Sequence, residues 1–267
     1  MCDRHLNWRR DALISRSLFG LHFECDLRDQ VQRYIYYLGL WEPDLTSFIK
    51  NRLKSGSIFI DVGANVGYFS LLASKVVGSA GQVIAIEASP KICRKLERNI
   101  HLNGANNIRV INKAVADRIG TIKLFAGPDS NLGQTTSIPR NELEVEGTVP
   151  AAPLAELVGV KWLKAASIIK IDIEGAEVPV LEEIANNINL LSSNVDICVE
   201  IWPEGYSKNE RISSVIERFQ NSGFKIYEIT NDYHPRNYFD YRSNESRVVL
   251  AKLPLKRTTD LLITRAL

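Results

Sequence analysis

Long hydrophobic runs are missing from this sequence of 267 residues. No segment approaches the roughly 20 apolar residues that a helix needs to cross a bilayer. The basic start, "MCDRHLNWRRDALISRSLF", also lacks the sustained apolar stretch of a secretory signal. We therefore expect no membrane insertion, no targeting segment and a cytoplasmic protein.

Paired cysteines and an excess of charge are missing too. The four cysteines, Cys2, Cys25, Cys93 and Cys198, are too scattered for a zinc site or a disulfide framework. A formal net charge of +2 argues against a protein built mainly to neutralise nucleic-acid phosphates. The hydrophobic content of 45% is that of an ordinary globular protein, long enough for one large domain.

Short apolar runs rich in β-branched residues alternate with segments of helical spacing. Five runs predict buried strands: 57–62, 82–87, 108–112, 167–173 and 195–201. One of the helical segments between them begins with Ser89 as a predicted N-cap and Pro90 at its first position. This alternation predicts right-handed crossovers and a doubly wound, Rossmann-like α/β sheet.

The last third of the chain breaks this rhythm. The patterns at 224–230 and 246–253 have no helix between them, so we expect an antiparallel hairpin that closes one edge of the sheet. The region 113–166 is irregular, with one short strand in "TIKLF" and a long loop of the kind that usually contacts a ligand.

The sequence divides into three parts. Residues 1–56 carry helical patterning interrupted at Gly39 and Pro43, and we expect a helical cap there. We expect residues 57–253 to form the main α/β domain, and residues 254–267 to form a C-terminal tail.

The stretch "FIDVGANVGYFS" (59–70) places an acid and a glycine turn where a buried strand meets a helix. Such a turn lets the backbone approach a ligand closely. The dinucleotide pattern G-x-G-x-x-G is not met, because Asn65 and Tyr68 stand where its second and third glycines belong. Asp61 would repel a pyrophosphate, and it suits a ligand with an ammonium or sulfonium group.

A second acid, Glu87, ends the next strand in "VIAIEASP". The ends of neighbouring parallel strands open onto the same crevice, and an acid there can accept hydrogen bonds from a ribose diol. With Asp61, Gly63, Asn65 and Gly67 it predicts a pocket for a nucleoside with a cationic amino-acid tail. S-adenosylmethionine is that ligand.

The chain resembles the FkbM family of class I methyltransferases over roughly residues 35–252. The resemblance is carried by "FIDVGANVGYFS", "VIAIEASP", "VINKAVAD", "IIKIDIEGAEVPVLE" and "ICVEI". It implies a seven-stranded sheet with its last strand antiparallel. It also implies S-adenosylmethionine-dependent O-methylation of a hydroxylated acceptor, such as a sugar, a polyketide or another small molecule or glycan.

The resemblance also implies roles for particular residues. It places Glu42, in "GLWEPD", at the methionine end of the cofactor. The other residues that it implies for cofactor binding are Asp61, Gly63, Ala64, Asn65 and Gly67 in the turn, Glu87 and Ala88 at the ribose and adenine edge, and Ala116 and Asp117 beside the adenine.

The stretch "KIDIEGAE" sets Lys170, Asp172 and Glu174 on one face of an extended chain. An alcohol acceptor must lose its proton during methyl transfer, and Asp172 is our first candidate to accept it, with His234 in "NDYHPRNY" second. Asp172 and Glu200 offer oxygen ligands of the kind that magnesium binds. No further Asp or Asn ligand follows the fifth strand, so we expect no metal.

Three alternatives stay open. A nucleic-acid amino-methyltransferase would usually carry an Asn/Asp-Pro-Pro-aromatic turn where this chain reads "DIEGAE". A nicotinamide-dependent dehydrogenase shares the architecture, but Asp61 and the unmatched glycine pattern argue against it. A non-catalytic cofactor-binding module would keep the pocket and lack turnover.

Overall fold

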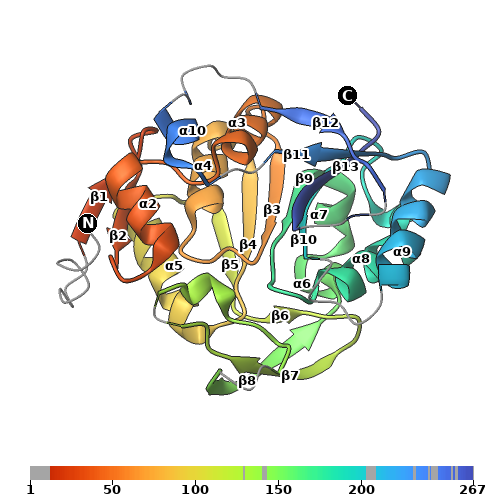
Figure 1. Ribbon diagram of the computed structural model, residues 1–267, viewed down its shortest axis with the longest axis horizontal. Coiled ribbons are helices and arrows are strands. Elements are labelled where there is room, and N and C mark those ends of the chain that lie inside the picture. The colour runs from red at the N-terminus through yellow and green to blue at the C-terminus, as the bar shows by residue number, and fades with distance from the viewer. Residues whose placement is uncertain are drawn as a thin grey trace.

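The computed structural model describes residues 13–128, 130–139, 143–202, 209–230, 233–239, 241, 246–253, 255 and 258–266. Within them one large sheet is flanked by helices on both faces (Figure 1). The order of its eight strands is β12-β11-β13-β10-β9-β3-β4-β5. Their bounds are β3 (Ile58–Val62), β4 (Gln82–Ile86), β5 (Ile108–Ile111), β9 (Ala166–Ile171), β10 (Asp196–Ile201), β11 (Lys225–Ile229), β12 (Val248–Leu250) and β13 (Thr259–Thr264).

The doubly wound α/β fold is confirmed. The strands β5, β4, β3, β9 and β10 are parallel, and crossover helices connect them. The main helices around the sheet are α4 (Tyr68–Val77), α5 (Pro90–Leu102), α8 (Glu177–Asn186) and α9 (Asn209–Asn221). Ser89 caps α5 as predicted, because its Oγ accepts a hydrogen bond of 3.2 Å from the Ile92 N–H.

The antiparallel end of the sheet differs from the prediction. The strands β11 and β12 do pair antiparallel, but β13 inserts between β10 and β11, antiparallel to both. Residues 259–264 were expected in a tail outside the sheet. All six are buried, because neighbouring strands flank them on both sides. The last antiparallel strand is therefore β13, and β12 adds an eighth strand at the edge.

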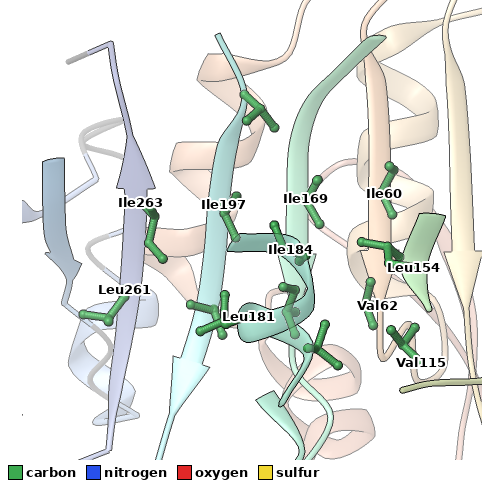
Figure 2. Close-up of a cluster of buried hydrophobic side chains, with 14 of the residues drawn as sticks. Ile60, Val62, Val115, Leu154, Ile169, Leu181, Ile184, Ile197, Leu261 and Ile263 are labelled. Atoms are coloured by element: carbon green, nitrogen blue, oxygen red, sulfur yellow. The ribbon is translucent and has the colours of Figure 1, made fainter. Parts of the chain in front are cut away.

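Alternate residues of the strands enter two separate cores. Figure 2 shows one of them, where Ile60, Ile169, Ile197 and Ile263 from four strands face Leu181 of α8. On the opposite face of the sheet the intervening residues, such as Phe59, Ile168 and Cys198, belong to a second buried cluster. Both faces of the sheet are covered, as the continuous apolar runs predict.

The N-terminal cap contains the two expected helices and a hairpin that was not expected. The helices are α2 (Gln30–Leu38) and α3 (Pro43–Arg52), and Gly39 ends α2 with a φ of 67°. The strands β1 (Leu13–Arg16) and β2 (His22–Cys25) pair antiparallel. Four-residue strands are too short for a clear alternation, and residues 1–12 of the predicted cap lie outside the described ranges.

The region 113–166 forms a second, small sheet of β6 (Ala114–Val115), β8 (Val145–Ala152) and β7 (Gly120–Phe125). The predicted short strand is β7. The pattern did not predict β8, because its Gly147 and Pro150 normally interrupt strands. The remaining short helices are η1 (Leu132–Gln134), α6 (Leu154–Val158), α7 (Val160–Ala165), η2 (Ile188–Leu190) and α10 (Pro235–Phe239).

In the part of the chain that is described, no helix is both long and apolar enough to cross a bilayer.

Candidate active site

A cavity of about 390 Å³ opens at the carboxyl ends of the parallel strands, within the size range of small-molecule sites. It extends from the glycine turn after β3 to the segment after β9. Among the predicted site residues, the cavity wall includes Glu42, Gly63, Asn65, Glu87, Ala88 and Asp172. The structure thus brings together predicted residues that are up to 130 positions apart in the chain.

The glycine turn has a backbone that requires glycine. Gly63 has a φ of 80° and Gly67 a φ of 91°. A Cβ on Gly63 would overlap the carbonyl oxygen of Asp172, and one on Gly67 would lie 2.5 Å from Leu96 Cδ1. The turn is therefore packed directly against the segment that carries Asp172.

Glu87 holds the turn in place. Its two carboxylate oxygens accept backbone hydrogen bonds of 2.9 Å, one from the Asn65 N–H and one from the Ser89 N–H. Burial raises the pKa of Glu87 to about 7, against the effect of these two hydrogen bonds. Each oxygen keeps a second lone pair, so the carboxylate can still accept hydrogen bonds from a ligand.

Asp61 is not part of the cavity wall. Its side chain shares a face of β3 with Phe59, is 1% exposed, and accepts a hydrogen bond of 2.6 Å from Ser70 Oγ. Lys170 Nζ lies 3.7 Å from its Oδ1. The expected direct contact between Asp61 and a cationic ligand is therefore not the arrangement seen here, in which Asp61 is paired within the protein.

Lys170 joins Asp61 to Asp172. Its Nζ donates a hydrogen bond of 3.2 Å to Asp172 Oδ2, while only 4% of the residue is exposed. Burial alone would lower the pKa of Lys170, but the carboxylates of Asp172 and Asp61 outweigh it and raise that pKa. The lysine stays charged, and it orients Asp172 at the cavity wall.

Further acids surround this end of the cavity. Glu42 has a φ of 42°, accepts a hydrogen bond of 3.1 Å from the Tyr233 hydroxyl, and has its pKa raised to about 8, mainly by burial. Burial and the charges of Asp172 and Asp260 raise the pKa of Glu200 to about 10. Both carboxyl groups therefore take up protons far more readily than exposed glutamates.

Asp172, Glu174 and Glu200 each offer a carboxylate oxygen, and these oxygens lie within 4.8 Å of one another. Such oxygens could ligate a hard divalent cation. The absence of a metal stays a prediction from the sequence.

Several predicted residues lie away from the cavity wall. Ala116 packs on the small sheet, and Asp117 is exposed. Ala64 and Gly67 lie behind the turn, buried against α5. His234 is exposed, and its Nδ1 accepts a hydrogen bond of 3.3 Å from the Arg236 N–H, so the structure does not bring it to Asp172.

Other residues of the wall had no signal in the sequence. Gln30 at the start of α2, and Asn131 and Gln134 at the two ends of the η1 turn, are single amides that no periodicity marks. Trp202 follows β10 directly, two positions after Glu200, so its position at a strand end was the one available clue. Tyr233 and Trp41 complete an aromatic rim, with ring centres 5.3 Å apart.

The sheet, with a cavity at its carboxyl edge, has the architecture of class I S-adenosylmethionine-dependent methyltransferases. The methyltransferase FkbM domain matches residues 61–226, which is more than half of the chain. The chain belongs to this family, and S-adenosylmethionine is its cofactor.

Individual relatives are distant. "Methyltransferase sdnD" of Sordaria araneosa is 25% identical over 217 residues, 70% of this chain and 80% of that protein. A protein-L-isoaspartate O-methyltransferase of Methanococcus aeolicus is 36% identical over 59 residues, 22% of this chain and 27% of that protein. The SAM-dependent O-methyltransferase of Thermotoga maritima aligns in space with a TM-score of 0.45 at 14% identity, over 95% of this chain and 78% of that one.

The residues of the cavity fit the cofactor. The wall is bare at Gly63 and Gly133, where added Cβ atoms would meet the Asp172 carbonyl and two amide groups. A buried amide oxygen of Asn131 also lacks a donor among the described residues. Space and polar atoms are thus available for a ligand with both donors and acceptors.

Proposed function

We propose that this methyltransferase transfers a methyl group to a hydroxyl of a small-molecule or glycan acceptor, such as a sugar or a polyketide. The observation that carries the proposal is the continuity of the cavity. One wall holds Glu87 and the glycine turn, and another holds Asp172 with the rim of Trp41 and Tyr233. Cofactor and acceptor can therefore share a single cavity.

S-adenosylmethionine supplies an activated methyl group on a sulfonium sulfur. In this proposal Glu87 accepts hydrogen bonds from the ribose diol, and the turn at Gly63 and Asn65 lies against the amino-acid portion. Ala88 borders the adenine, and Glu42 lies towards the methionine end. Asp61 does not contact the cofactor in this proposal, and instead it holds Lys170 beside Asp172.

Asp172 is the group that accepts the acceptor's proton. Its side chain is 33% exposed, so it is open to the cavity while it stays bonded to Lys170. The new O–CH3 bond forms as the sulfonium S–CH3 bond breaks, and the hydroxyl proton passes to the Asp172 carboxylate. General-base assistance of this kind contributes about 10²–10⁴-fold.

The test is a methyl-transfer assay on matched acceptors. Sugars and hydroxylated polyketides are compared with amines, an isoaspartyl peptide and RNA, with and without a chelator and added magnesium. We expect methyl ethers on the hydroxylated acceptors. Methylation confined to nitrogen or to a carboxylate would contradict the proposal.

The variant Asp172→Asn separates chemistry from binding. We expect turnover to fall by about 10²–10⁴-fold, while calorimetry shows little change in affinity for S-adenosylhomocysteine. A variant with full turnover would show that Asp172 is not the proton acceptor.

A further inference from the structure

The loop after β7 carries a buried acceptor atom without a donor. We call residues 126–139, apart from the undescribed Asp129, the β7 loop. Asn131 of this loop lines the cavity, and its Oδ1 is buried. Within the described ranges, no group donates a hydrogen bond to that oxygen. Burying an unsatisfied carbonyl oxygen is costly, so the atom points to a donor on a ligand.

A bare glycine lies between this oxygen and a second amide. A Cβ on Gly133 would lie 3.1 Å from Asn131 Oδ1 and 2.9 Å from Asn65 Nδ2. Gly133 and Asn65 both line the cavity. The β7 loop and the glycine turn thus present an acceptor and a donor on either side of a position that has no side chain.

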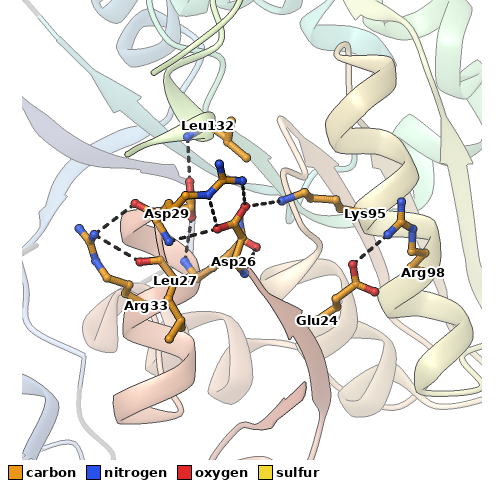
Figure 3. A network of polar contacts seen from close by, with 10 residues as sticks. Glu24, Asp26, Leu27, Asp29, Arg33, Lys95, Arg98 and Leu132 are labelled. Carbon is orange, nitrogen blue, oxygen red and sulfur yellow. Dashed lines mark hydrogen bonds and ion pairs between the residues drawn. The ribbon is translucent and has the colours of Figure 1, made fainter. Parts of the chain in front are cut away.

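The first half of the β7 loop is fixed to the N-terminal cap. The Leu132 N–H donates a hydrogen bond of 2.8 Å to Asp29 Oδ2 (Figure 3), and the other oxygen of Asp29 caps α2. The Gln30 N–H donates a bond of 2.8 Å to the Ser130 carbonyl. Both chain neighbours of Asn131 are therefore bonded to the start of α2, which preorganises its side chain.

The second half of the loop is fixed to the sheets. Thr136 Oγ1 donates a hydrogen bond of 2.6 Å to the Glu174 carbonyl, just after β9. Phe125 of β7 and Thr136 exchange backbone hydrogen bonds of 2.8 and 3.0 Å. The loop is anchored at both ends, so the positions of Asn131 and Gly133 are set by the fold.

We propose that Asn131 binds the cofactor's amino-acid end, with its Oδ1 accepting a hydrogen bond from the α-ammonium group and Asn65 Nδ2 donating to the α-carboxylate. The ammonium donates and the carboxylate accepts, which matches the two amides around Gly133. The other walls suit the other parts of the cofactor, since Ala114, Val115 and Ile122 form an apolar surface for adenine. The assignment rests on the placement of the ribose at Glu87 in the proposed function.

Two ligands test it without turnover. S-adenosylhomocysteine has the amino-acid end, whereas 5′-methylthioadenosine keeps the adenosine and lacks that end. By calorimetry, we expect Asn131→Ala to weaken the binding of S-adenosylhomocysteine by about 10-fold or more, which is the loss expected for one hydrogen bond to a charged group. The affinity for 5′-methylthioadenosine stays within about twofold. Asn194→Ala, at an exposed asparagine before β10, is the matched control, and we expect it to leave the affinity for both ligands unchanged.

Two results would overturn the assignment. Unchanged affinity for S-adenosylhomocysteine would show that Asn131 makes no contact, and an equal loss for both ligands would place the contact on the adenosine. Thermal melting without ligand checks that the variant is folded. If it is not, Asn131→Asp takes its place, because a carboxylate still accepts from the ammonium. We then expect retained binding of S-adenosylhomocysteine, and its loss would equally overturn the assignment.

The variant Glu87→Gln, measured alongside, tests the ribose position of the proposed function independently of the Asn131 assignment. If the ribose lies at Glu87, this variant weakens the binding of both ligands. A result in which Glu87→Gln affects both ligands and Asn131→Ala affects neither would refute the amide assignment alone.

Discussion

The two sides of the cavity are built in different ways. On the cofactor side, the turn is held by residues close in sequence, since Glu87 bonds to Asn65 and Ser89, 22 and 2 positions away. On the opposite side, the Tyr233 hydroxyl bonds to Glu42 across 191 positions, and the Leu132 N–H bonds to Asp29 across 103. The first side is a local motif on a sheet, and the second is assembled from three distant segments.

This difference explains what the sequence could predict. The five parallel strands, both helices of the cap and the positions of Glu87 and Asp172 follow from hydrophobic periodicity and from acids at strand ends. The direct contact expected between Asp61 and a cationic ligand stays a prediction, since the structure shows Asp61 bonded within the protein. Its position at the end of β3 was right, but which face of the strand meets the cavity depends on how α4 packs.

The missed features are non-local. The insertion of β13 between β10 and β11 depends on the pairing of the chain's last strand with partners more than 30 residues away. Asn131 and Gln30 became neighbours of the cavity only because the β7 loop bonds to the start of α2. Periodicity along the sequence does not predict which distant segments come into contact.

The largest expected effect concerns Lys170, where the two sides meet. Lys170→Met leaves the carboxylates of Asp61 and Asp172 without their cation, and breaking a buried pair typically costs about 3–5 kcal/mol. We expect a loss of this size in the free energy of unfolding, measured in urea. Lys164→Met, at an exposed lysine of α7, is the control. A loss below about 1 kcal/mol would mean that the two sides are not coupled through this charge.

The next effect concerns the contact between the turn and Asp172. Gly63→Ala forces a Cβ into the Asp172 carbonyl at a φ of 80°. Gly104→Ala is a matched control, because Gly104 has a φ of 59° and no atom within 4 Å of the added Cβ. Both variants carry the left-handed penalty of about 1–2 kcal/mol, and we expect Gly63→Ala to lose about 1–3 kcal/mol more through overpacking. Equal losses in urea denaturation would show that the segment after β9 moves aside freely.

The third effect isolates the cofactor side. Glu87→Ala removes hydrogen bonds from the ribose to a charged group, so we expect the binding of S-adenosylhomocysteine to weaken by about 1.5–3 kcal/mol in calorimetry. Glu97→Ala, at an exposed glutamate of α5, should leave the affinity unchanged. An unaltered affinity in Glu87→Ala would remove the ribose from this position.

The pH dependence of S-adenosylhomocysteine binding gives a second test of Glu87 as the acceptor of the ribose hydrogen bonds. The pKa of Glu87 is raised to about 7 by burial, and ribose hydroxyls donate best to the ionised form. A ligand that favours the ionised carboxylate binds more weakly as the pH falls through 7, because a proton must then be released on binding. We expect affinity for S-adenosylhomocysteine to fall between pH 8 and pH 6 in the wild type. In Glu87→Gln the decline should be much shallower, and an equally steep decline would assign the titration to another group.

The smallest expected effect tests the acceptor side, where the sequence offered two proton acceptors and the structure brings only Asp172 to the cavity. His234 is exposed, and its Nδ1 already accepts from the Arg236 N–H. Its replacement by alanine is a surface change, worth within about 0.5 kcal/mol or roughly twofold in rate. We expect turnover of His234→Ala to stay in that range while Asp172→Asn loses most of it. The reverse result would mean that the loop after β11 closes over the acceptor during turnover and brings the imidazole to the reacting hydroxyl.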